Sequence, residues 1–204
     1  MFINIYNLKK KRGDNVRPTR KLILILTLAG LLLLVKTLLP YAKPEGTYSI
    51  KKVYNYLKDE NNQRKVYNKA VKLNGGDSAN TCVYFVSEVL RRNGISIDES
   101  TCNTEQLINI LKDKGWKKIN NYKELEPGDL CFTTDSLGNK KGISSHTYIF
   151  MGWVEEGSFD YAYICDNQAK DYNNQVYHIR NIAVVDEANG FTKDAFSFFM
   201  RPKS

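Results

Sequence analysis

The side chains best suited to nucleophilic chemistry in this sequence are four cysteines, accompanied by only two histidines. Cys82 has the most favourable position, because it follows Asn80 and Thr81 at the predicted start of a helix. With Asn80 as the N-cap, Cys82 is the second helical residue, where the positive helix end favours a thiolate and free N–H groups can bind an oxyanion. We therefore predict a nucleophile at Cys82; a buried structural cysteine or half of a disulfide is the alternative.

A thiol nucleophile also needs a base, and the two histidines differ in their surroundings. His146 begins a predicted strand after the loop at residues 142–145, so its ring could reach across to a helix N-terminus. His178 lies in a later strand and shares its face with Arg180. Because a polar strand face is typical of a solvated surface, we predict His146 as the base and His178 as a surface residue.

A neutral imidazole in such a site is oriented by a third polar group. The predicted strand after His146 ends in Asp166 and Asn167, and a hairpin through residues 155–157 makes the two strands antiparallel neighbours. Either side chain could therefore orient the ring. The predicted catalytic set is Cys82, His146 and Asp166, with Asn167 as the alternative to Asp166.

The elements that must position these residues change type along the chain. Apolar residues at helical spacing in the first half predict helices around residues 50–57, 66–71, 80–92 and 104–114. Short β-branched or aromatic runs then predict strands around residues 130–133, 147–153, 161–165, 176–179 and 195–200. Helices followed by strands indicate an α+β fold, with N-terminal helices packed on a small antiparallel sheet of about five strands.

The N-terminal region carries most of the net charge of +8. Residues 1–40 hold eight Lys or Arg and one Asp, whereas residues 41–204 hold 22 basic and 21 acidic residues, which argues against a nucleic-acid partner. The apolar run after the basic cluster predicts an uncleaved transmembrane signal anchor, with a cleaved secretory signal as the alternative. The predicted domains are a basic cytoplasmic N-terminus (1–21), the anchor (22–40), a linker (41–47) and one extracellular domain (48–204).

Three segments resemble the NlpC/P60 family of extracellular cysteine peptidases and its relatives, the CHAP amidases. The first runs from residue 66 through Gly75-Gly76 to Cys82 and Phe85-Val86. The second, ELEPGDLCF at residues 124–132, is similar to the family's Leu-x-Pro-Gly-Asp-Leu strand entry. The third, HTYIFMG at residues 146–152, resembles its catalytic histidine strand. The resemblance covers roughly residues 66–200 and implies a papain-like fold with Cys82 as nucleophile and His146 as base.

The cysteine segment departs from the commonest pattern of that family. NlpC/P60 proteins usually have Asp-Cys-Ser-Gly, whereas residues 81–84 read TCVY, a spacing closer to that of CHAP. Their third catalytic residue is often a second histidine, whereas the matching strand here ends in Asp166 and Asn167. The departure leaves the identity of the orienting residue open between these two side chains.

The remaining candidate ligands do not form a recognised set. Cys131 and Cys165 fall at apolar positions of predicted strands and are expected in the core, whereas Cys102 precedes a helix and is expected to be more exposed. No Cys-x-x-Cys, His-x-x-x-His or phosphate-binding glycine loop is present, so we expect neither a metal nor a cofactor.

Taken together, the resemblance implies a membrane-anchored extracellular cysteine hydrolase that cleaves an amide bond of peptidoglycan or of a wall-derived peptide. Cleavage could be endopeptidase cleavage in the stem peptide or amidase cleavage near the sugar, through a thioester at Cys82. A catalytically inactive wall-binding or scaffold module of the same fold is the alternative, and acyl transfer through the same thioester is a third reading.

Overall fold

The computed structural model describes residues 49–203 of the 204-residue chain. The predicted basic N-terminus, signal anchor and linker lie outside the described residues. Between residues 49 and 203, no helix is long and apolar enough to cross a bilayer.

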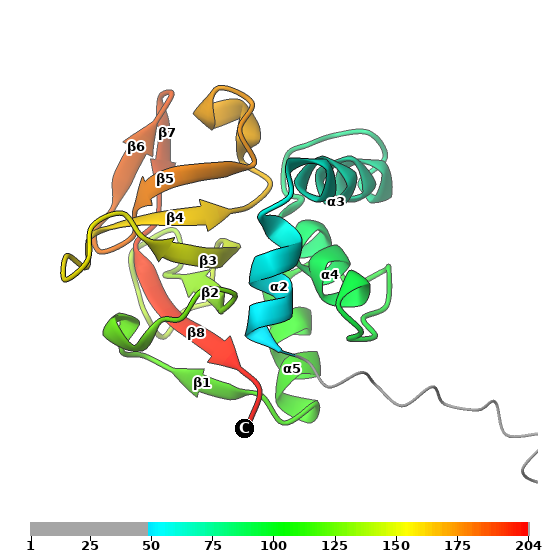
Figure 1. Ribbon diagram of the computed structural model, residues 1–204, viewed down its shortest axis with the longest axis horizontal. Coiled ribbons are helices and arrows are strands. Elements are labelled where there is room, and N and C mark those ends of the chain that lie inside the picture. The colour runs from blue at the N-terminus through cyan, green and yellow to red at the C-terminus, as the bar shows by residue number, and fades with distance from the viewer. Residues whose placement is uncertain (1–48, 204) are drawn as a thin grey trace, which may run out of the picture. The chain divides into compact units, whose positions relative to one another are not determined.

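The described chain is α+β, as the sequence predicts, with its helices first and its strands after them (Figure 1). The α-helices are α2 (Ile50–Leu57), α3 (Glu60–Leu73), α4 (Cys82–Arg92) and α5 (Thr104–Asp113). The strands are β1 (Lys117–Ile119), β2 (Leu130–Thr133), β3 (Thr147–Trp153), β4 (Tyr161–Cys165), β5 (Tyr177–Asn181), β6 (Asp186–Ala188), β7 (Phe191–Lys193) and β8 (Phe196–Arg201). Two short 3₁₀ helices are η1 (Tyr122–Glu124) and η2 (Ala169–Tyr172).

The main sheet has six strands in the order β1-β8-β2-β3-β4-β5, and every neighbouring pair is antiparallel. The five predicted strands correspond to β2, β3, β4, β5 and β8. The prediction of about five strands missed β1, because its three residues are partly exposed and carry no alternation that a sequence could reveal. It also missed the separate hairpin of β6 and β7, which turns at residues 189–190.

Polar side chains fix where α3 begins and ends. The carboxylate of Asp59 accepts hydrogen bonds from the backbone N–H groups of Asn61 and Asn62. Asp59 is therefore the N-cap, and the polar residues 60–62 belong to the first turn of the helix. Asn74 is the C-cap, and Gly75 and Gly76 follow at φ of +67° and +98°. Glycine adopts these left-handed conformations at little cost, which lets the chain leave α3 and turn toward α4.

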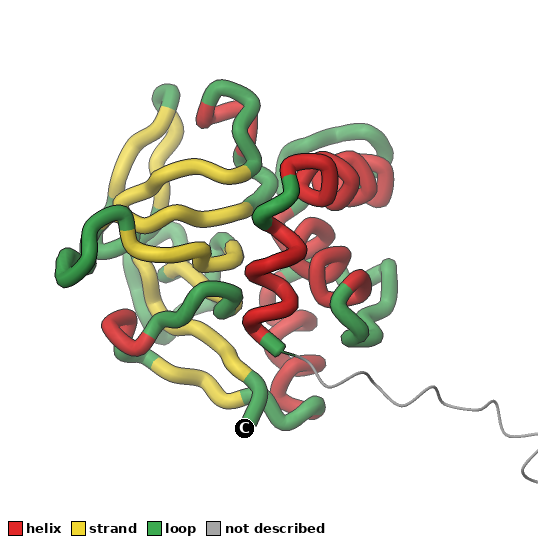
Figure 2. Tube along the Cα trace, in the orientation of Figure 1, coloured by secondary structure: helices red, strands yellow, loops and turns green. Residues whose placement is uncertain are grey.

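Within the described residues, the helices α2 to α5 lie together beside one face of the sheet (Figure 2). α4 is the central helix of this layer: eight of its 11 residues are buried, and it packs on α3 and β3. Side chains alternate along β2 and β3, so that Leu130 and Ile149 face the helices whereas Cys131 and Tyr148 enter a second core on the other face. Apolar burial on both sides therefore fixes α4, and the position of its first residue, against the sheet.

The Pro-Gly-Asp segment before β2 has a structural role. A Cβ atom on Gly128 would lie 2.0 Å from the backbone oxygen of Ile50, so only glycine fits against the start of α2. The buried carboxylate of Asp129 accepts two hydrogen bonds from Arg201, at 2.8 Å from Nε and 2.6 Å from Nη2. The segment thus joins α2, the entry to β2 and the end of β8.

Candidate active site

Cys82 is the first residue of α4, and Thr81 is the N-cap. The sequence-based prediction placed Cys82 one position later, after an Asn80 cap, and that prediction was wrong because Asn80 adopts a left-handed conformation with φ of +55°. Thr81 makes no side-chain cap: its hydroxyl donates instead to the carbonyl of Ser78 at 2.8 Å. The N–H groups at the start of α4 therefore have no side-chain acceptor at the N-cap.

Hydrogen bonds hold the loop that presents Cys82. The side-chain amide of Asn74 donates to the carbonyls of Asp77 and Ala79, at 3.1 and 2.9 Å. The Asp77 carboxylate in turn accepts from the Ala79 N–H at 2.9 Å. The path from α3 into α4 is thus fixed by local contacts.

His146 precedes β3, shares a pocket with Cys82 and is hydrogen-bonded to Asp166. Its Nε2 is 2.8 Å from Oδ2 of Asp166, and its ring lines the same pocket as Cys82. Because Nε2 is taken by the carboxylate, Nδ1 is the nitrogen that remains for the thiol. The backbone of His146 is anchored by Thr133, whose hydroxyl accepts from the His146 N–H at 3.0 Å.

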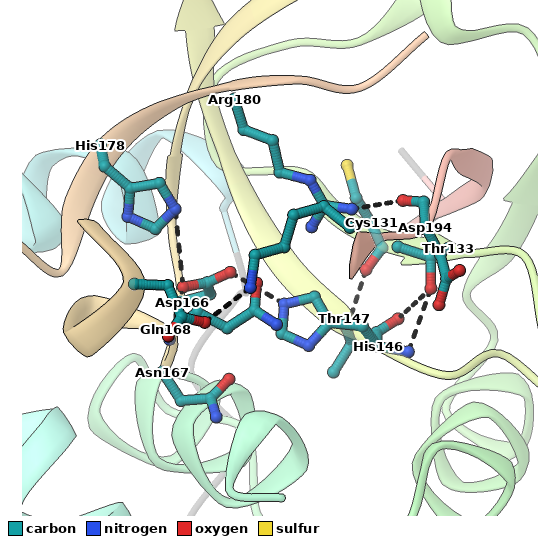
Figure 3. A network of polar contacts seen from close by, with 12 residues as sticks. Cys131, Thr133, His146, Thr147, Asp166, Asn167, Gln168, His178, Arg180 and Asp194 are labelled. Carbon is teal, nitrogen blue, oxygen red and sulfur yellow. Dashed lines mark hydrogen bonds and ion pairs between the residues drawn. The ribbon is translucent and has the colours of Figure 1, made fainter. Parts of the chain in front are cut away.

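Asp166 follows the last residue of β4 and is fully buried. Its Oδ1 accepts from the backbone N–H of Gln168 at 2.8 Å, while Oδ2 faces His146 (Figure 3). Asn167, the alternative orienting residue, does not contact His146 in this way; its side chain donates to Ser78 at 3.5 Å. The structure therefore brings together Cys82, His146 and Asp166.

Burial and ion pairing have opposite effects on the pKa values of His146 and Asp166. Burial lowers the pKa of His146, but the hydrogen bonds and negative charges of Asp166 and Cys82 raise it overall to about 9. Burial raises the pKa of Asp166, but His178 and His146 together bring it well below its ordinary value. At neutral pH, His146 therefore holds a proton opposite an ionised Asp166.

His178 is buried, with 4% of its surface exposed, so the prediction of a surface residue was wrong. Its Nε2 lies 3.8 Å from Oδ1 of Asp166, and its Nδ1 is 3.1 Å from the carbonyl of Gln175. The ring of Tyr172, from η2, stacks on it at a centroid distance of 3.6 Å. His178 is therefore covered by the segment that directly precedes β5, and it stands behind Asp166.

A pocket of about 150 Å³ opens beside Cys82 and His146. Its other walls include Asn167, Gln168, Arg180, Lys193 and Asp194. A second hollow of about 420 Å³ shares Asn167, Gln168 and Lys193 with this pocket and therefore lies next to it. A larger hollow of about 590 Å³ between α2, α3 and residues 173–177 is lined by none of the candidate catalytic residues.

Comparison with known proteins identifies the family. A family profile described as bacteriophage peptidoglycan hydrolase (Amidase_5) matches residues 56–185, a span that contains Cys82, His146 and Asp166. The chain belongs to this family. Searches of curated proteins and of solved structures gave no match. Membership confirms the prediction of a peptidoglycan hydrolase at the level of the family, whereas the narrower assignment to NlpC/P60 or to CHAP remains a prediction.

Sequence reasoning missed two cations of this peptidoglycan hydrolase, Arg180 and Lys193, which line the pocket and are almost completely buried. Arg180 on β5 pairs with Ala162 on β4, and His178 pairs with Ile164. Both polar residues therefore lie beside β4, the strand that directly precedes Asp166. The position of Arg180 on the strand next to β4 is the signal by which the sequence could have identified it as a pocket residue. Lys193 gave no such signal, because the β6–β7 hairpin was not predicted.

The other cysteines have the surroundings that the sequence predicts. Cys131 and Cys165 are buried, Cys102 is exposed, and all four cysteines are free. Within residues 49–203, no group of three or more His, Cys, Asp or Glu side chains is arranged to hold a metal ion.

Proposed function

We propose that this chain is a cysteine hydrolase that cleaves an amide bond in peptidoglycan, with Cys82 as nucleophile, His146 as base and Asp166 as orienting residue. The observation that carries the proposal is one imidazole that lines a pocket together with Cys82 and has a buried carboxylate 2.8 Å from its Nε2. A nucleophile, a base and a group that orients the base form the functional unit of covalent acyl-transfer enzymes.

The proposed reaction begins with the thiol proton on His146, which agrees with its pKa of about 9. The Cys82 thiolate, favoured by the positive end of α4, attacks the carbonyl carbon of the scissile amide. The N–H groups of the first turn, which have no side-chain cap, stabilise the oxyanion. His146 then protonates the leaving amine, and a water molecule activated by His146 hydrolyses the thioester.

The papain-like fold and the extracellular location are further parts of the proposal. A cysteine at the start of a buried helix, facing a histidine at the start of an antiparallel strand, supports the predicted NlpC/P60-like or CHAP-like architecture. The sequence pattern of residues 1–40 supports a signal anchor that places the hydrolase domain outside the membrane, where its substrate lies.

The test is release of fragments from purified peptidoglycan by the full-length protein, followed by mass spectrometry. We expect Cys82→Ser and His146→Ala to lower the rate by about 10³-fold or more, because each removes a partner of the acyl-transfer step. Cys102→Ser is the matched control: it removes an exposed thiol and should leave the rate unchanged. The fragment masses would identify the bond, and release by Cys82→Ser at the wild-type rate would refute the cysteine mechanism.

A further inference from the structure

Arg180 is a buried cation whose hydrogen-bonding capacity is mostly unused. Only 2% of its surface is exposed, and it lines the same pocket as Cys82 and His146. Its Nη2 donates to the backbone carbonyl of Asp194, and the side chain runs toward that residue (Figure 3). Among the described residues, neither Nε nor Nη1 has a hydrogen-bond partner.

Such an arrangement is costly unless a ligand completes it. A guanidinium is always charged and carries five N–H donors, and burying it with unpaired donors destabilises a protein. No hydrogen bond of Arg180 goes to a carboxylate; the Asp194 carboxylate accepts instead from Ser145. The ring centroid of Tyr148 lies 5.6 Å from the guanidinium carbon of Arg180, so a cation–π contact also helps to hold this side chain.

The second cation of the pocket has a partner. Lys193 Nζ lies 2.6 Å from Oδ2 of Asp171, and this ion pair joins β7 to η2. The Asp166 carboxylate is likewise engaged by His146 and by the Gln168 N–H. Of the cationic side chains that line the pocket in the described residues, Arg180 is therefore the one without a carboxylate partner, left to meet a negative charge brought by the substrate.

We propose that Arg180 is a specificity-determining residue that binds a free carboxylate of the wall peptide next to the scissile amide. The pocket of about 150 Å³ takes only a small part of a substrate, and its wall holds Arg180 together with the attacking Cys82. A planar carboxylate is the group that a guanidinium recognises best. The inference rests on the proposed function, and it adds that an anionic peptide is preferred to its amidated counterpart.

Alkylation of Cys82 by two reagents of nearly equal size tests this proposal without knowledge of the substrate. Iodoacetate carries a carboxylate and iodoacetamide a carboxamide, and modification of Cys82 in the full-length protein is followed by peptide mass spectrometry. We expect Arg180→Gln to lower the ratio of the iodoacetate rate to the iodoacetamide rate by about tenfold or more, the size of one charge-assisted hydrogen bond. Arg180→Lys should retain part of the wild-type ratio. Arg64→Gln, which removes an exposed cation on α3, should leave the ratio unchanged.

The outcomes separate the two proposals. An unchanged ratio in Arg180→Gln, or equal slowing of both reagents, would overturn the role of Arg180 in binding an anion. Failure of the wild type to react with either reagent would overturn the cysteine mechanism and this inference with it.

A second measurement uses the substrate itself. Peptidoglycan whose free carboxylates have been amidated with carbodiimide and ammonia should be cleaved about tenfold or more slowly than untreated peptidoglycan by the wild type. Arg180→Gln should cleave both preparations at similar, low rates. Equal cleavage of both preparations by the wild type would contradict the inference while leaving the hydrolase proposal intact.

Discussion

Asp129 and Asp166 are both fully buried and both paired with a basic side chain, yet the two partners differ in their ability to release a proton. Asp129 is held by two hydrogen bonds from Arg201, a partner whose guanidinium group stays protonated. Asp166 is paired with His146, a partner that can release its proton. An aspartate with an arginine partner ties two strands together, whereas one with a histidine partner can support proton transfer.

The surroundings of the two carboxylates are consistent with this difference. Burial raises the pKa of Asp129 above its ordinary value even though Arg201 opposes the change. Asp166 is also buried, but two imidazoles and a backbone N–H outweigh the burial and lower its pKa. The Arg201 pair lies at the junction of β2 and β8, away from the pocket that contains Cys82 and His146.

The largest effect should come from breaking the structural pair. Asp129→Asn removes the negative charge opposite Arg201, and we expect the free energy of unfolding to fall by about 3 kcal/mol, since two charge-assisted hydrogen bonds to a fully buried carboxylate are lost. Urea unfolding measures this change. The kcat/KM of the remaining folded protein should be within about twofold of the wild type, because no catalytic contact is altered. A loss of kcat/KM comparable with that of Asp166→Asn would remove the distinction between the two pairs.

Asp166→Asn should reduce activity more than stability. We expect kcat/KM on peptidoglycan to fall by about 10²-fold, because the carboxylate that orients and stabilises protonated His146 is lost. In the wild type, the activity should decline as the pH rises through the His146 pKa of about 9, and in Asp166→Asn this decline should begin at lower pH. The Asp129→Asn variant is the control, and its alkaline limb should stay in place. An alkaline limb that does not move in Asp166→Asn would show that another group controls His146.

The His146–Asp166 pair also makes the stability of the fold depend on pH. The pKa of His146 is raised in the folded protein from 6.5 to about 9, so its pairing stabilises the fold fully below pH 6.5, and this contribution is lost as the pH rises through 9. The pKa of Asp166 is lowered, so its contribution is present above the ordinary carboxyl range and is lost as the pH falls below it.

The smallest of the three effects concerns the glycine next to Asp129. Gly128→Ala should destabilise the protein by about 2 kcal/mol, because the new Cβ meets the backbone of Ile50 and the φ of +103° disfavours a side chain. Gly75→Ala is the matched control: its φ is +67°, but no atom lies within 4 Å of the added Cβ, so about 1 kcal/mol or less is expected. Thermal unfolding measures both, and equal losses would show that the close approach to α2 contributes nothing.

Local patterns were sufficient for most of the secondary structure. The helices α2 to α5 and the strands β2, β3, β4, β5 and β8 lie where periodicity and turn residues place them, except that α3 begins at Glu60, ahead of the apolar run predicted around residues 66–71. The start of α4 was misplaced, because the left-handed conformation of Asn80 depends on a loop that Asn74 and Ser78 hold through hydrogen bonds. Strand β1 pairs with β8 over only three residues, a contact that no local pattern contains.

The sequence by itself determined that Cys82 would start a buried helix, that His146 would open a strand and that a polar residue would end the next strand. Only the tertiary structure decided that Asp166 rather than Asn167 faces His146. The backbone N–H of Asp166 donates to the carbonyl of Val176, just before β5, and this long-range contact helps to set the direction of the Asp166 side chain. The tertiary structure also decided that the polar face of β5 is buried. A sequence shows that His178 and Arg180 share a face, but Tyr172 and the Lys193–Asp171 pair, which help to enclose that face, come from segments without a local signal. Lys193 and Asp194 reach this face from the end of the β6–β7 hairpin, and this packing places Arg180 in the pocket beside Cys82.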